Sequence, residues 1–156
     1  MVETMERAME KGQSLRLTRV IKASRERVFE AWTNPRLVTK WFGTPDTTVV
    51  GMTMDLRVGG RYSIETAGGS PDKDGKKRLM RVEGVYREIL PVERLCFTWK
   101  AAWAPEEDGL VTVSLREVAD GTELTLEHTG FLSEQSMMAH DKGWRSSMEK
   151  LAGALE

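Results

Sequence analysis

Few side chains in this sequence are able to do metal or nucleophilic chemistry. The chain contains one cysteine, Cys96, and two histidines, His128 and His140. A structural zinc site takes four ligands, usually cysteine and histidine, so these residues do not supply one. The run DKDG at 72–75 starts like a calcium loop, but lysines follow where an oxygen ligand and a glycine belong. We predict no metal site and no cofactor.

The sequence also lacks a recognisable phosphate cradle or activated nucleophile. In GGSPDKDGKK, residues 68–77, the glycine spacing of a P-loop is off by one and a lysine takes the serine or threonine position. Gly59-Gly60 lacks the third glycine of a dinucleotide-binding turn. No serine lies in a G-x-S-x-G elbow, and Cys96 alternates to the outer face of its strand pattern. Ordinary loop glycines explain both glycine-rich stretches.

His128 and Asp141 are the remaining candidates for acid–base chemistry. His128 ends a strand pattern on its inward side, and Asp141 shares a helical stripe with Met137 and Trp144. In a dry cavity each would favour the charged form of the other, and the pair could transfer protons. The alternative, which we favour, is a core histidine with satisfied hydrogen bonds and an aspartate on a solvated helix turn. Both residues stay weak catalytic candidates, and an enzyme is the less favoured class.

The first elements of the chain must position two tryptophans. The residues at 14–23 alternate between apolar and polar, which predicts a strand. Ser24 is a natural helix N-cap, and Asn34-Pro35 supplies a second N-cap followed by proline at the first helical position. Each of the two short helices that follow presents one tryptophan from its apolar face.

From residue 48 the apolar period changes to two, which is typical of strands. The first of these strands is predicted to end in the hairpin VGGR, residues 58–61, because glycines take the positive φ of such a turn. Five further strands follow up to residue 128, and one long helix capped by Ser133 ends the chain. The residues predicted to share the apolar face of the first strand are Val50, Met52, Met54 and Leu56.

The predicted order is one strand, two small helices, six strands and a long helix. A seven-stranded antiparallel sheet with one apolar face must cover that face, and the terminal helix is the one long element left to do so. A curved sheet wrapped around one helix cannot be filled as tightly as two flat layers. We therefore predict an α+β fold with a cavity between helix and sheet, formed by a single domain at 14–156 after a flexible leader at 1–13.

The composition argues against several partners. Lysine and arginine number 23 against 24 acidic residues, so the net charge of −1 does not favour nucleic acid or an anionic membrane. No apolar run approaches the ~20 residues of a membrane-spanning helix. The charged N-terminus has no apolar core of a secretory signal. We expect a soluble, cytoplasmic protein, monomeric or homodimeric.

The same residues carry a resemblance to a known family. The order of elements resembles the helix-grip fold of the START and birch-allergen-like (SRPBCC) superfamily, and the local sequence resembles homologues of the activator of the 90-kDa heat-shock-protein ATPase. The resemblance runs from residue 15 to residue 155, with departures before residue 14 and in the loop 67–77. The matching pieces are LTRVIKASRERVFEAWTNPRLVTKWFG (17–43), DLRVGGRY (55–62), GVYREILPVERLCFTW (84–99), GTELTLEHTGF (121–131), and Gly143-Trp144 followed by Leu151.

This resemblance implies a cavity for an apolar or amphipathic small molecule, without naming one. Trp32 is expected to pack between the small helices and the sheet, and Trp41 to close the cavity mouth. Alternation turns Tyr62 and Tyr86 inward and Arg81 outward. The residues predicted to line the cavity are Trp41, Phe42, Met54, Tyr62, Tyr86, Phe97, Trp99, Met137, Trp144 and Met148.

Three functions are compatible with these observations. The first is a ligand-binding domain without catalysis. The second is an interaction protein that binds the 90-kDa chaperone, as the resemblance to the activator implies. The third is an enzyme of the cyclase or hydratase type that uses His128 in the same cavity.

Overall fold

The computed structural model describes residues 13–68 and 78–156, so the predicted leader and the loop at 67–77 lie almost entirely outside the described residues. The order of elements confirms the prediction: one strand, two short helices, six strands and a long helix. The elements are β1 (Gln13–Ile21), α2 (Arg25–Thr33), α3 (Pro35–Trp41), β2 (Thr47–Met54), β3 (Arg61–Gly68), β4 (Arg78–Leu90), β5 (Arg94–Ala101), β6 (Gly109–Val118), β7 (Gly121–Phe131) and α4 (Glu134–Leu155).

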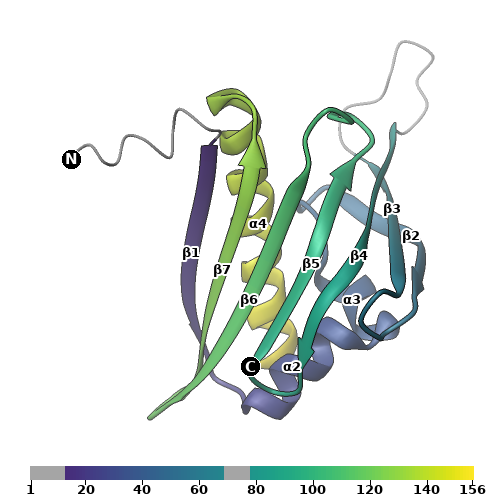
Figure 1. The fold of residues 1–156 in the computed structure, drawn as a ribbon. Coiled ribbons are helices and arrows are strands. Elements are labelled where there is room, and N and C mark those ends of the chain that lie inside the picture. The colour runs from purple at the N-terminus through teal and green to yellow at the C-terminus, as the bar shows by residue number, and fades with distance from the viewer. Residues whose placement is uncertain (1–12, 69–77) are drawn as a thin grey trace.

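The strands form one antiparallel sheet in the order β1-β7-β6-β5-β4-β3-β2. Strands β2 to β7 follow one another as a meander, and β1 returns to pair with β7, with Leu17 opposite Leu126. Figure 1 shows the sheet curving around α4, which runs along one face, while α2 and α3 lie at the end near the C-terminus. This arrangement confirms the predicted helix-grip fold.

Side chains at the helix starts explain where the helices begin. The Ser24 hydroxyl accepts a hydrogen bond from the Arg27 amide at 3.2 Å, and the Asn34 side chain accepts one from the Arg36 amide at 3.0 Å. Ser133 caps α4 through the Ser136 amide at 3.0 Å. Each cap satisfies an N–H group that has no partner within its own helix, so all three predicted helix starts are confirmed.

Strand β2 departs from the predicted alternation. The pairing with β3 shifts between Val49 and Gly51, which is a β-bulge. One extra residue reverses the side-chain direction, so Val49 turns inward and Val50 is 56% exposed. Leu56 lies beyond the end of β2 and is 42% exposed. The prediction was therefore right for Met52 and Met54 and wrong for Val50 and Leu56.

The hydrophobic core lies between α4 and the concave face of the sheet. On the helix, Trp144, Met148 and Leu151 are buried, at spacings of four and three residues along one stripe. Met137 and Leu155 are partly buried against the same core. On β5 every second residue from Leu95 is buried. The sheet and α4 therefore confine whatever space remains between them.

Candidate functional site

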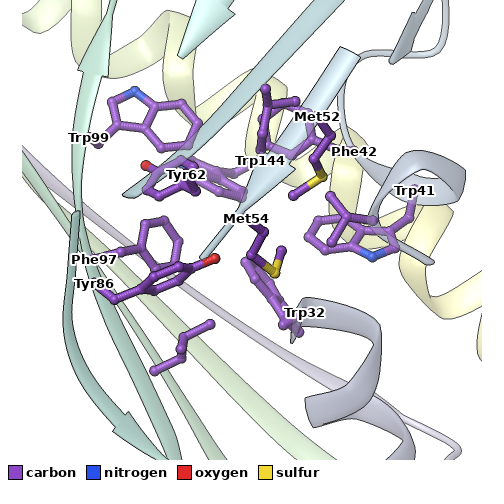
Figure 2. A pocket seen from close by; sticks show the side chains of 13 residues that line it. Trp32, Trp41, Phe42, Met52, Met54, Tyr62, Tyr86, Phe97, Trp99 and Trp144 are labelled. Carbon is purple, nitrogen blue, oxygen red and sulfur yellow. The ribbon is translucent and has the colours of Figure 1, made fainter. Parts of the chain in front are cut away.

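Two adjoining hollows lie between α4 and the sheet. The inner one, which we call the inner cavity, has a volume of about 30 Å³. Because one water needs ~10–15 Å³ of such volume, the inner cavity has room for only about two waters. Figure 2 shows why: aromatic rings from the sheet face Trp32 and Trp41 across it, with methionines in between. Its lining is Trp32, Val38, Trp41, Phe42, Met52, Met54, Tyr62, Ile64, Tyr86, Leu95, Phe97, Trp99 and Trp144.

The second hollow, which we call the outer chamber, has a volume of about 230 Å³. It shares Phe42, Ile64, Trp99 and Trp144 with the inner cavity, so these side chains form the partition between the two. Its described lining contains no lysine, arginine, aspartate or glutamate, and His140 is its one histidine. The remaining members of the lining are Gly43, Thr44, Thr47, Thr66, Met80, Val82, Trp103, Ala139, His140, Gly143 and Ser147.

The structure brings most of the predicted cavity residues together, but around the inner cavity, which is the smaller of the two hollows. Of the ten, Met137 and Met148 line neither hollow. Met148 lies against a third hollow of about 490 Å³, a surface groove between β1 and α4. The other eight line the inner cavity, and three of them, Phe42, Trp99 and Trp144, also reach the outer chamber.

Trp32 and Trp41 share one environment rather than the two that the sequence suggested. Their rings lie 4.5 Å apart, centroid to centroid, and both line the inner cavity. Trp41 is the more buried of the two, at 2% exposed, and its indole nitrogen donates a hydrogen bond to the Ala31 carbonyl at 2.9 Å. Trp41 therefore forms an inner wall, and the mouth of the hollow lies elsewhere.

His128 is buried beside Trp144, whose indole nitrogen donates a hydrogen bond to His128 Nδ1 at 3.0 Å. Burial, reinforced by the nearby His140, lowers the pKa of His128 to about 3, so the ring is neutral at physiological pH. Asp141 instead bonds Arg145 at 2.9 Å on the solvent side of α4. Within the described residues the structure shows no hydrogen bond or ion pair between His128 and Asp141, which leaves no assembled acid–base pair.

His140 and Trp103 are two lining residues that the sequence reasoning missed. His140 is 7% exposed, and its Nδ1 lies 2.9 Å from the Ser136 carbonyl. Because a carbonyl only accepts, Nδ1 carries the proton, and the neutral ring keeps Nε2 as an acceptor. Trp103 stacks on His140 at 5.7 Å and is 45% exposed. A signal for His140 was present, since it precedes Trp144 by four residues on the same helical stripe.

The loop that carries Trp103 is attached to the start of α4 by a buried carboxylate. Glu107 is buried and accepts hydrogen bonds from the Leu132 amide at 3.0 Å and from the Ser136 hydroxyl at 2.9 Å. Negative charge near the first turn of a helix is favourable. Glu107 thus holds the β5–β6 loop, and with it one wall of the outer chamber, against α4.

A second attachment holds the loop between α3 and β2 over the outer chamber. The Ser147 hydroxyl accepts a hydrogen bond from the Gly43 amide at 2.9 Å and donates one to the Gly43 carbonyl at 3.2 Å. Gly43 has φ +104°, and a side chain there would also meet the Thr47 hydroxyl. Lys150 donates to the Thr44 carbonyl at 2.6 Å, and burial lowers the pKa of this amine.

Replacing Ser147 by alanine is expected to loosen this loop. The change removes both side-chain bonds to Gly43, so we expect a loss of about 1–2 kcal/mol in the free energy of unfolding. Amide hydrogen exchange at Gly43 should become faster. The matched control is Ser146→Ala, because the buried Ser146 hydroxyl has no hydrogen-bond partner among the described residues. Equal effects of the two substitutions in urea unfolding would contradict the role given to Ser147.

Tyr62 and Tyr86 point inward and Arg81 outward, as alternation predicted. The Tyr62 hydroxyl donates to the Thr98 carbonyl at 2.5 Å. Burial raises the pKa of Tyr62 and that of Tyr86 well above the ordinary value for the phenol. Both rings are therefore neutral parts of the wall at physiological pH.

The described residues give no support to metal chemistry or to a membrane span. Within 13–68 and 78–156 there is no group of three or more histidine, cysteine, aspartate or glutamate residues that could hold a metal ion. None of the helices in these ranges has the length and apolar character needed to cross a bilayer.

The fold and the paired hollows define a class, that of helix-grip proteins whose curved sheet encloses a long C-terminal helix. Within that class the sequence matches the family described as Activator of Hsp90 ATPase homolog 1-like protein over residues 22–156. The chain belongs to this family. Among curated proteins, no sequence matches it significantly.

Solved structures share the fold of this chain. Protein CV1439 from Chromobacterium violaceum is 28% identical with a TM-score of 0.80, and the match covers 92% of this chain and 97% of that one. CalU16 from Micromonospora echinospora is 25% identical with a TM-score of 0.68, covering 93% and 77%. The AHSA1 (SPO3351) protein from Silicibacter pomeroyi is 23% identical with a TM-score of 0.77, covering 92% and 97%, and at that identity it shows the fold alone.

Proposed function

We propose that this protein binds an apolar or amphipathic small molecule in the outer chamber. The observation that carries the proposal is an unfilled space of about 230 Å³ between α4 and the sheet, walled largely by aromatic and aliphatic side chains. This volume has room for a ligand of on the order of ten non-hydrogen atoms. Sites for small molecules are typically concave and mostly apolar, with a few polar groups that orient the ligand.

The other two hollows fit a ligand less well. The inner cavity has only about 30 Å³ left between its rings. The surface groove is larger, but each of its charged side chains already has a hydrogen-bond partner: Arg19 bonds Glu149 at 2.6 Å, Arg145 bonds Asp141 at 2.9 Å, and Lys150 bonds the Thr44 carbonyl at 2.6 Å. A groove whose charged groups already have partners offers little for a ligand to replace. The outer chamber is therefore the hollow that fits a ligand best.

The experiment is a thermal-shift measurement on the full chain with neutral apolar probes, namely 2-naphthalenemethanol, naphthalene and 1-dodecanol. A ligand that binds only the folded state at 100 times its Kd stabilises by about 2.7 kcal/mol. For a chain of this size we expect the melting temperature to rise by roughly 5–10 °C with the best probe. If none of the probes raises it, the proposal fails.

A pair of methionine substitutions tests whether the rise in melting temperature comes from binding in the outer chamber. Met80 lines the outer chamber, whereas Met138 is 59% exposed on α4 and lines none of the three hollows. Met80→Trp should fill the chamber and abolish the shift. Met138→Trp should leave it unchanged. A shift that survives Met80→Trp would place the binding elsewhere.

The family description supports a second candidate, stimulation of a 90-kDa chaperone ATPase through an outer surface. Its test is the ATPase rate of that chaperone with and without this protein. An increase that persists in Met80→Trp would favour this function over ligand binding, and an unchanged rate would remove the candidate.

A further inference from the structure

No close packing contact explains Gly143 in α4. Gly143 lies in the interior of the helix, where glycine costs about 1 kcal/mol relative to alanine. The sequence suggested that a close approach of helix and sheet beside Trp144 requires it. That explanation is wrong, because a Cβ added at Gly143 meets no atom within 4 Å. Gly143 lines the outer chamber, so the missing side chain leaves space there instead of allowing contact.

Among the described residues, the chamber lining also lacks a partner for a charged ligand. Its described lining contains no lysine, arginine, aspartate or glutamate. A buried carboxylate or ammonium without an opposite charge is strongly unfavourable, whereas a neutral polar group needs only hydrogen bonds. The described side chains of the lining therefore select against ionised ligands.

Two polar atoms of the lining residues are buried without a hydrogen-bond partner among the described residues: Trp99 Nε1 and His140 Nε2. The first is a donor, and the second is an acceptor in the neutral ring described above. The ring centroids lie 6.0 Å apart. Both atoms are enclosed by neighbouring side chains, so a ligand reaches them only when the lining moves. A ligand hydroxyl would then accept from the indole and donate to the imidazole, whereas a carboxylate would only accept.

Resting on the proposed function, we infer that the outer chamber selects an uncharged, hydroxyl-bearing ring compound that lies against the α4 backbone at Gly143. Gly143 is then a specificity-determining residue, since its missing side chain provides the depth for the ring. The aromatic walls from Phe42, Trp99 and Trp144 suit a flat ring, because offset and edge-to-face packing of aromatic groups is favourable.

The test compares two probes of nearly equal shape, 2-naphthalenemethanol and 2-naphthoate, by isothermal titration calorimetry with the full chain. The carboxylate is expected to bind more than about tenfold more weakly than the alcohol, because its charge finds no partner. Gly143→Leu fills the chamber and should weaken binding of the alcohol by more than about tenfold. Gly153→Leu is the matched control, since Gly153 is also in α4, is exposed, and also has open space around it.

Folding of the variants is checked by urea unfolding. Gly143→Ala should be at least as stable as the wild type, because its Cβ meets no neighbouring atom. Gly143→Leu should still unfold in one cooperative transition. Equal binding of the two probes, or wild-type affinity in Gly143→Leu, would overturn this inference and leave ligand binding itself intact. A wild type that binds neither probe would overturn the inference and the proposed function together.

Discussion

Replacing Trp144 by alanine is expected to lower the free energy of unfolding by about 3–5 kcal/mol. Its ring lies 5.1 Å from Trp99, 6.0 Å from Trp32 and 6.1 Å from Phe42, centroid to centroid. It joins α4 to Trp99 in the sheet, to Trp32 in α2 and to Phe42 at the end of α3. It also forms part of the partition between the two hollows. Removing it leaves a void that the surrounding rings fill only in part.

Trp144→Phe separates the contribution of the hydrogen bond to stability from the contribution of ring packing. Phenylalanine keeps most of the ring but leaves His128 Nδ1 buried without its donor, so we expect a smaller loss of about 1–3 kcal/mol. The control is Trp103→Phe, because Trp103 is 45% exposed and should change stability by no more than about 0.5 kcal/mol. Urea unfolding measures all three. The account would be wrong if Trp144→Ala were no more destabilising than Trp103→Phe.

The second large effect is a loss of stability in mild acid. Folding lowers the pKa of His128 to about 3, whereas in the unfolded chain it is about 6.5. Below pH 6.5 the unfolded state therefore binds a proton that the folded state does not, and the folded state loses stability as the pH falls toward 3. The slope approaches about 1.4 kcal/mol per pH unit, which amounts to about 2 kcal/mol between pH 6.5 and pH 5.

His128→Asn isolates this contribution. Asparagine can still accept a hydrogen bond from the Trp144 indole but does not titrate. Between pH 7.5 and pH 5, the free energy of unfolding of the variant should therefore fall by about 2 kcal/mol less than that of the wild type. Carboxylates far from residue 128 are common to both proteins and cancel in the comparison. Identical pH dependence in the two proteins would mean that folding does not lower the pKa of His128.

Local patterns were sufficient to predict the architecture. Ser24, Asn34 and Ser133 each have the side chain that a helix start needs, and the alternation around Phe97 and Leu126 fixes which face of the sheet is buried. These signals depend on neighbours within a few residues, so the sequence contains them directly. Such local signals failed at Val50, because the bulge before Gly51 depends on how β2 pairs with β3.

The site was harder to predict because it depends on contacts between distant segments. Gly43 and Ser147 bond across 104 positions of the chain, and the outer chamber exists where that loop meets α4 and the sheet. Periodicity found the residues that face inward, which is why eight predicted side chains surround the inner cavity. It does not say how much space the side chains leave, and Gly143 shows that an absent side chain can matter as much as a present one.

Methyl NMR on protein with ¹³C-labelled methionine is the most direct test of where a ligand binds. Met80 lines the outer chamber, Met54 the inner cavity and Met148 the surface groove, so each hollow has its own reporter. On titration with 2-naphthalenemethanol, we predict a saturable ring-current shift of the Met80 methyl group and no change at Met148. An unchanged Met80 signal, or a shift confined to Met148, would contradict binding in the outer chamber.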